Sequence, residues 1–154
     1  RWGTCAVIAL IHDVVIVVGV FSILGQITGA EVNAMFIVAV LTVVGYSINN
    51  TVVVFDRIRE NVSKHISPDF GVIVNSSLTE TLERSLNTSL TTLCVILALL
   101  LFGGATIHYF VLALLIGLLA GTYSSLCIAP TLLVVWERGG WGQLFSWLPF
   151  VKSA

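Results

Sequence analysis

Four long apolar runs constrain the fold of this sequence more than any other feature. They cover about residues 5–24, 34–55, 85–102 and 109–136. An α-helix needs roughly 20 apolar residues to cross the hydrocarbon core of a bilayer, and these runs are close to that length or longer. A chain in lipid has to satisfy its own backbone hydrogen bonds, which leaves helices as the form for such runs. We therefore predict an all-α membrane protein with four transmembrane helices bundled over residues 1–136.

The composition agrees with a membrane protein and excludes one class of partner. Hydrophobic residues make up 57% of the chain and charged residues only 10%, whereas an ordinary soluble domain has roughly 25% charged residues. The formal net charge of -1 shows no excess of basic residues, and proteins that bind nucleic acid usually carry one. We therefore expect contact with membrane lipid and no nucleic-acid partner.

The basic residues indicate how the four runs are oriented. If the runs cross the membrane in alternation, the connections at residues 25–33 and 103–108 lie on one side, and neither contains Lys or Arg. Every basic residue then lies on the other side: Arg1, Arg57, Arg59, Lys64, Arg84, Arg138 and Lys152. Basic residues concentrate on the cytoplasmic side of membrane proteins. We therefore predict that both termini of the chain and residues 56–84 are cytoplasmic.

Two further segments are predicted to lie along the membrane surface. Within residues 69–84, Val74, Leu78 and Leu82 are spaced four apart, which gives a helix one apolar stripe. We expect this interfacial helix to precede the third span. Residues 137–154 mix aromatic residues with Gly and Pro, and we expect a cytoplasmic interfacial tail there.

Asp13 is the one clear acid inside an apolar run, and His12 precedes it. A carboxylate in mid-membrane costs about 2.5–3.5 kcal/mol on insertion scales, so it needs a partner or a wet cavity. Asp13 is therefore a candidate for proton coupling, with His12 as a candidate proton shuttle. A structural ion pair between Asp13 and Arg84 is the alternative.

The second run carries polar side chains where valine or leucine would be expected. Tyr46 and Asn50 are four residues apart and share one helix face, and Asn49 lies on the neighbouring face. Lipid offers an amide no hydrogen-bond partner, so these side chains should face other helices or water. Together with Asp13 and Arg84 they form a candidate polar cluster. Interhelical hydrogen bonding without a further role is the alternative for the asparagines.

Two other patterns are candidates for packing or function. Gly117 and Gly121 form a GxxxG pattern in the fourth run, which lets a second helix approach closely. The second run ends in a cytoplasmic charged motif, Asp56, Arg57, Arg59 and Glu60. A run of charges at the end of a helix is most often a solvated terminus.

The sequence gives no sign of an enzyme, a metal site or a cofactor. Cys5, Cys94 and Cys127 each lie alone in an apolar run, without a second cysteine or a histidine at the spacing of metal ligands. We expect all three to be small buried side chains. An intramembrane aspartyl protease needs two acids, but Asp13 stands alone, and the GxSxG and HExxH motifs are absent.

The stretch GYSINNTVVVFDRIREN, residues 45–61, closely resembles the signature of the SecF family, a subunit of the SecDF accessory complex of bacterial protein export. Three other stretches resemble the family in the same order: ALIHDVVIVVGVFS, LTETLERSLNTSLTTL and LFGG. The resemblance covers nearly the whole chain apart from its Trp-rich tail. It implies a resistance-nodulation-division-type bundle of six helices, of which this chain would hold the last four.

The resemblance also implies a function and partners. A SecF protein uses the proton gradient to help complete the translocation of preproteins through the SecYEG translocon, together with SecD. The implied location is the bacterial cytoplasmic (inner) membrane, with the thylakoid membrane as another candidate. A structural subunit that assembles or stabilises the translocon without conducting protons is the alternative function.

One position departs from the family pattern. The family carries an acid in its GYSxNDT motif and an arginine in the next span. Arg84 matches the arginine, but Asn50 occupies the position of the acid. An amide cannot titrate, so Asn50 can hydrogen-bond water or Arg84 but cannot carry a proton. Either Asp13 or SecD then carries the proton, or this chain is a variant, natural or engineered, with weakened coupling.

Overall fold

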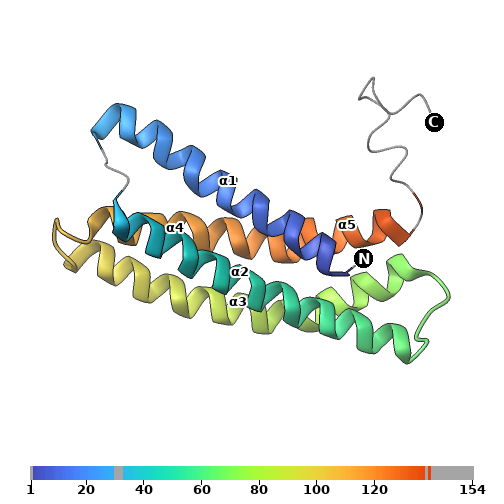
Figure 1. The fold of residues 1–154 in the computed structure, drawn as a ribbon. Helices are drawn as coiled ribbons and strands as arrows, with labels where there is room; N and C mark the ends of the chain where they lie inside the picture. Colours follow the sequence, from blue (N-terminus) through green and yellow to red (C-terminus); the bar gives the residue numbers. More distant parts are fainter. Residues whose placement is uncertain (1, 30–32, 138, 140–154) are drawn as a thin grey trace, which may run out of the picture.

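The chain folds into a bundle of long helices (Figure 1). The computed structural model describes every residue except 1, 30–32, 138 and 140–154. Its helices are α1 (Trp2–Thr28), α2 (Ala34–Ser63), α3 (Phe70–Phe102), α4 (His108–Tyr123), the π-helix η1 (Ser124–Ile128) and α5 (Ala129–Glu137). The last three follow one another without a break and form one long helix, His108–Glu137.

Local sequence signals set where the helices begin and end. The side chain of Asn33 accepts a hydrogen bond from the backbone N–H of Phe36 (3.2 Å) at the start of α2. Asp69 caps α3 in the same way through the N–H of Gly71 (2.9 Å). Such short polar side chains satisfy N–H groups that the first turn of a helix leaves unpaired. After α3 the chain turns at Gly104, whose positive φ of 75° suits glycine.

α2 and α4 form the centre of the bundle, because they make the most extensive contact of any two helices. α1 packs against both on one side and α3 packs against both on the other, while α1 and α3 make almost no contact with each other. In Figure 1 the α2–α3 connection lies at the end of the bundle where α1 begins, and the α3–α4 connection lies at the opposite end. This is the arrangement that alternating spans require.

The described part of the chain contains four helices long and apolar enough to cross a membrane: Trp2–Ile27, Ala34–Ser63, Phe70–Phe102 and His108–Glu137. The predicted all-α membrane fold is therefore confirmed, and the chain is a multi-pass membrane protein. Residues 69–84 do not form a separate helix, because all but Asp69 belong to α3, which continues into the third span. The position of this segment along the membrane surface stays a prediction. The predicted tail at residues 137–154 lies outside the described residues, apart from Glu137 and Gly139.

In the middle of α3 the buried face is polar, and two leucines there point outward. Ser77, Thr81 and Ser85 lie four apart and are buried against the bundle, whereas Leu82 and Leu86 are 42% and 48% exposed. Lipid is as apolar as leucine, so burying leucine brings no gain, whereas small side chains let helices approach closely. Cys5 is buried, but Cys94 and Cys127 are exposed, so the expectation that all three cysteines are buried is wrong for two of them.

Candidate functional site

The described side chains of α1 that are buried form one narrow stripe: Cys5, Ala9, Asp13, Val17 and Phe21, each four residues after the last. Residues four apart in a helix share a face, so the stripe points the Asp13 carboxylate into the bundle. Cys5 and Ala9 belong to one apolar cluster, and Val17 and Phe21 belong to another. Asp13 is only 1% exposed and lies between these two clusters.

Two serine hydroxyls from two other helices converge on the Asp13 carboxylate. Ser47 Oγ of α2 donates to Asp13 Oδ2 at 2.5 Å, and Ser124 Oγ of η1 donates to the same oxygen at 2.7 Å. The other carboxylate oxygen, Oδ1, lies 3.2 Å from His12 Nδ1. His12 is the only ionisable side chain in contact with this carboxylate in the described part of the chain. Hydrogen bonds of this kind are what make a buried carboxylate tolerable in a low-dielectric interior.

The helix that supplies Ser124 changes its form at that residue. The α-helical pattern of α4 ends at Tyr123, and Ser124 begins the π-helix η1. Single π-turns inside α-helices are rare and occur frequently at functional sites. Gly121 lies one turn earlier, and a Cβ built there would be 3.7 Å from Asp13 Oδ2 and 3.3 Å from Ser47 Cβ. The absence of a side chain at Gly121 therefore keeps room for the carboxylate and its serine partner.

The other glycine of the GxxxG pattern lies even closer to α2. A Cβ built at Gly117 would be 2.1 Å from Cγ2 of Val43. Val43 and Ser47 are one turn apart on α2, as Gly117 and Gly121 are on α4, so the two helices touch along matching ridges. The close α2–α4 crossing thus holds Ser47 at the carboxylate.

A second chain of hydroxyl groups links the helices on the α3 side of the bundle. Tyr46 Oη lies 3.0 Å from Ser89 Oγ, and Ser89 Oγ lies 2.9 Å from Thr122 Oγ1. Thr122 in turn donates to the carbonyl of Leu118 at 2.8 Å. Tyr46 therefore belongs to this hydroxyl chain and not to the set of groups around Asp13.

The two asparagines of the motif point in different directions. Asn50 is 6% exposed, and its side-chain nitrogen has no hydrogen-bond partner among the described residues. Asn49 is exposed on the outer surface of α2. The burial of Asn50 therefore agrees with the expectation that its amide faces other helices. Asn49 instead lies on the outer surface of this chain.

The structure does not place Arg84 with Asp13. Arg84 is exposed on α3 and borders a pocket of about 310 Å³ that is also lined by Asp56, Arg57 and Glu80. None of the described ion pairs joins Arg84 to Asp13, so the structural ion pair considered from the sequence is wrong. The reason is that Asp13 faces α2 and η1 from α1, whereas Arg84 is on α3 on the other side of the bundle.

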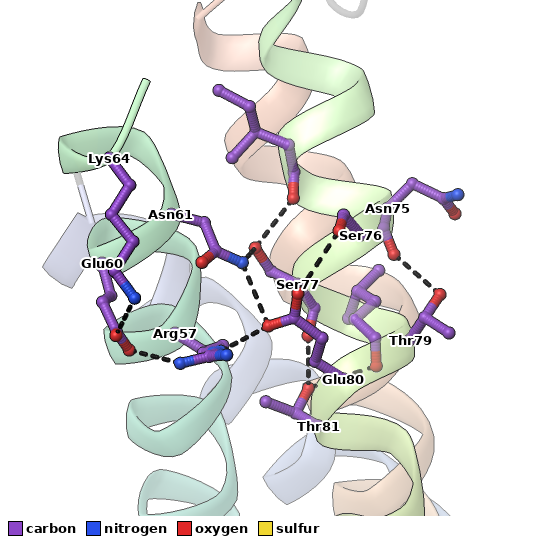
Figure 2. Close-up of polar contacts among 12 residues, drawn as sticks. Arg57, Glu60, Asn61, Lys64, Asn75, Ser76, Ser77, Thr79, Glu80 and Thr81 are labelled. Atoms are coloured by element: carbon purple, nitrogen blue, oxygen red, sulfur yellow. Dashed lines mark hydrogen bonds and ion pairs between the residues drawn. The ribbon is translucent and has the colours of Figure 1, made fainter. Parts of the chain in front are cut away.

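Arg57 is the centre of an ion-pair network where the α2–α3 hairpin closes (Figure 2). Its Nη1 donates to Glu60 Oε2 at 2.6 Å, and its Nε donates to Glu80 Oε2 on α3 at 2.5 Å. Lys64 adds a further ion pair to Glu60 at 2.6 Å. The charged motif is therefore more than a solvated helix end, because Arg57 joins two helices.

A buried hydrogen bond lies beside this network. Asn61 and Ser77 are 1% and 0% exposed, and Asn61 Nδ2 donates to Ser77 Oγ at 2.9 Å. Asn61 also donates to Glu80 Oε2 at 3.2 Å, which links the buried pair to the ion pairs. Figure 2 shows these side chains gathered between α2 and α3.

Sequence reasoning identified Asp13 and the glycine pair but did not select their partners Ser47 and Ser124, nor the hairpin residues Asn61 and Glu80. One signal was available for the serines, since both are polar residues within long apolar runs. Two partners of Glu80, Arg57 and Asn61, come from a different helix, and spacing along one helix does not show them. Among the described residues, no three His, Cys, Asp or Glu side chains are grouped in a way that could hold a metal ion.

Comparison with known proteins gives the family. The family described as "Protein export membrane protein SecD/SecF, C-terminal" matches residues 1–139. Protein translocase subunit SecF of Thermobaculum terrenum is 54% identical over 94% of this chain and 46% of its own length. The SecF subunits of Anaerolinea thermophila and Synechocystis are 49% and 45% identical over 95% and 89% of this chain. The chain spans about half the length of these relatives.

A solved structure, described as the crystal structure of SecDF in a super-membrane-facing form, shares the fold. It superposes with a TM-score of 0.82 and 44% sequence identity, and the match covers 94% of this chain and 19% of the SecDF chain. The same four-helix arrangement is thus present in a membrane region of that larger protein. By its family match, its relatives and this fold, the chain belongs to the SecD/SecF family of protein-export membrane proteins, as a SecF member.

Proposed function

We propose that this chain is the membrane part of a SecF subunit that couples the proton gradient to the completion of protein export. The observation that carries the proposal is the Asp13 carboxylate, which is 1% exposed and held by Ser47 and Ser124 at the junction of three helices. An ionisable residue inside a membrane helix bundle is by default a functional group, because it is costly to keep. Asp13 is the residue we assign as the proton carrier.

His12 provides a route between Asp13 and the outside of the bundle. Its side chain is 36% exposed, and its Nδ1 lies 3.2 Å from Asp13 Oδ1. An imidazole can accept a proton on one nitrogen and release one from the other, so it can pass protons between a buried carboxylate and water. His12 is therefore the proton shuttle in this proposal. Its ring contacts Oδ1 of Asp13, whereas both serines donate to Oδ2.

The hydrogen bonds of Asp13 suggest how a change in its protonation would move helices. An ionised carboxylate accepts hydrogen bonds from Ser47 and Ser124 more strongly than a protonated one does. Loss of the charge therefore loosens the contact between α1, α2 and the π-turn at Ser124. Because packed helices shift between discrete arrangements, this loosening would alter the α2–α4 packing and move the extracytoplasmic part of the subunit.

The partners in this proposal are SecD, the SecYEG translocon and preprotein substrates, in the bacterial cytoplasmic membrane or the thylakoid membrane, with the termini of the chain in the cytoplasm.

Exposed polar side chains on the outer surface of the bundle support a protein partner within the membrane. The exposed threonines Thr88 and Thr91 donate to carbonyls of their own helix, which satisfies them in lipid. Asn49 and Asn87 are exposed as well, and no described residue accepts a hydrogen bond from their side chains. Amides in that position gain from a neighbouring subunit such as SecD.

The test is the gradient-dependent release of a translocated preprotein from vesicles that contain the full-length protein, SecD and the translocon. Asp13→Asn keeps an oxygen that can accept from the serines but cannot titrate, so we expect gradient-dependent release to fall about tenfold, within the usual range of coupling energies. Asp13→Glu should retain part of the response. Glu83→Gln, which removes an exposed acid from α3, is the matched control and should have no effect. Normal gradient dependence in Asp13→Asn would refute the proposal.

A structural subunit is the second candidate function, and Asn50 is the observation that favours it. The position where the family resemblance implies an acid holds an amide that is buried and lacks a partner for its nitrogen. The same release assay with Asn50→Asp separates the two functions. If only the Asn50→Asp form responds to the gradient, the native chain is a structural member. If the native chain already responds, an acid at position 50 is dispensable and Asp13 or SecD carries the proton.

A further inference from the structure

A groove lies between the start of α1 and the end of α2, and it shares only Asp56 with the pocket beside the Arg57 network. It has a volume of about 560 Å³ and is lined by Trp2, Gly3, Ala6, Val52, Phe55, Asp56 and Arg59. Gly3 and Ala6 supply almost no side-chain bulk on α1, and a Cβ at Gly3 would meet no atom within 4 Å. The shallow surface of α1 at these residues therefore forms one wall of the groove.

The two ends of the groove differ in polarity. Asp56 and Arg59 border one end, and both are exposed. Val52, Phe55 and Ala6 make the rest of the lining apolar. Trp2 packs edge-on against Phe55, with ring centroids 5.5 Å apart, and tryptophan concentrates at the headgroup level of membranes. The groove thus changes from charged to apolar along its length, as a phospholipid does.

The two charged residues that border the groove, Asp56 and Arg59, form no ion pair with any other described residue. Arg57 and Glu60, on the same turns of α2, are engaged in ion pairs with Glu80 and Lys64. Residues three apart on a helix have Cβ atoms about 5–6 Å from each other. One anion and one cation are therefore presented side by side, with Asp56 also bordering the pocket toward α3.

We propose that this groove binds one phospholipid with a zwitterionic headgroup that ends in a primary ammonium, as in phosphatidylethanolamine. The Arg59 guanidinium binds the phosphate, because guanidinium donors match phosphate oxygens. The headgroup ammonium lies on the Asp56 carboxylate, and an acyl chain lies along Ala6, Val52 and Phe55. Phosphatidylglycerol would place the same phosphate on Arg59 but offers no positive charge to Asp56, and a choline headgroup cannot donate a hydrogen bond to the carboxylate.

The experiment is native mass spectrometry of the full-length protein offered phosphatidylethanolamine, phosphatidylcholine and phosphatidylglycerol with identical acyl chains in equal amounts. We expect phosphatidylethanolamine to be retained about fivefold more than either other lipid, as one additional charged contact near a membrane surface allows. Arg59→Gln should lower its retention about fivefold by the same reasoning. Asp56→Asn should remove the preference over phosphatidylglycerol. Both substituted residues are exposed, so these variants should fold.

Two further variants decide between this site and general attraction of lipid to charge. Lys64→Gln removes a cation from the same end of α2, away from the groove, and should leave retention unchanged. Ala6→Trp fills the apolar part without changing any charge and should lower retention as Arg59→Gln does. Equal retention of the three lipids would overturn the proposal, and so would an effect of Lys64→Gln as large as that of Arg59→Gln. If another helix covers the groove, the protein will show no lipid preference and no response to Arg59→Gln. That outcome also overturns the proposal.

Discussion

At Gly117, α4 lies so close to α2 that a single methyl group has no room. The distance of 2.1 Å from a built Cβ to Val43 Cγ2 is shorter than any van der Waals contact. One turn further along, Gly121 leaves space for Ser47 and for the carboxylate of Asp13. The two glycines that let α4 approach α2 therefore also make room for the contact between Ser47 and Asp13.

Gly117→Ala should destabilise the protein by about 1–3 kcal/mol, because inserting a methyl group into packed helices forces side chains or backbone to shift. The measurement is unfolding of the full-length protein in detergent micelles. Gly45→Ala is the matched control, because a Cβ there meets no atom within 4 Å, and alanine favours a helix over glycine by about 1 kcal/mol. The double variant Gly117→Ala with Val43→Ala should recover part of the loss. Equal stability of the two single variants would contradict the close packing.

The residue types of this site could be predicted from the sequence, but most of the contacts could not. A lone acid and a GxxxG pattern stand out in an apolar run, so Asp13 and Gly121 were identified directly. Ser47 and Ser124 are common residues in membrane helices, and 111 positions separate Asp13 from Ser124. Only the fold shows that these hydroxyls meet at one carboxylate. The same limit explains why the Asp13 to Arg84 pair was wrong, since depth in the membrane does not show which helices are neighbours.

At the scale of elements, α2 and α3 form a hairpin held by polar contacts at its closed end. Asn61 on α2 donates to Ser77 and to Glu80 on α3, and Arg57 reaches Glu80 as well. The apolar stripe predicted at residues 69–84 instead lies partly outside, at Leu82. Periodicity correctly indicated a helix there. It did not show which face is buried, because in a membrane the bundle side can be the more polar one.

Asn61→Ala should loosen this hairpin, because it removes the buried donor to Ser77. The net loss of one typical hydrogen bond costs about 0.5–1.5 kcal/mol, and the Ser77 hydroxyl keeps its bond to the carbonyl of Ile73. Hydrogen exchange at the ends of α2 and α3 should become faster, while exchange in α4 stays the same. Asn75→Ala is the control, because Asn75 is exposed on α3 and only its backbone carbonyl takes part in a described hydrogen bond. Unchanged exchange in the Asn61 variant would mean that the hairpin does not depend on this contact.

At the scale of the whole molecule, the alternation of the spans places successive connections at opposite ends of the bundle. The α2–α3 connection lies at one end and the α3–α4 connection at the other (Figure 1). The charged network of Arg57, Glu60 and Glu80 lies beside the first connection. The number of spans and their alternation were predictable from hydropathy alone. The orientation is a separate prediction that depends on where the basic residues are, and it requires its own test.

Two single cysteines can test this orientation once Cys5, Cys94 and Cys127 have been changed to alanine. Ile66→Cys reports on the α2–α3 connection, where Ile66 is 52% exposed, and Ala105→Cys reports on the exposed α3–α4 connection. Since basic residues favour the cytoplasm, a membrane-impermeant maleimide should label Ile66→Cys only in inside-out vesicles and Ala105→Cys only in intact cells stripped of their wall. Both should react after detergent is added. Labelling of both from the same side would contradict the alternation of the spans, whereas the reverse pattern would keep the fold and contradict only the orientation.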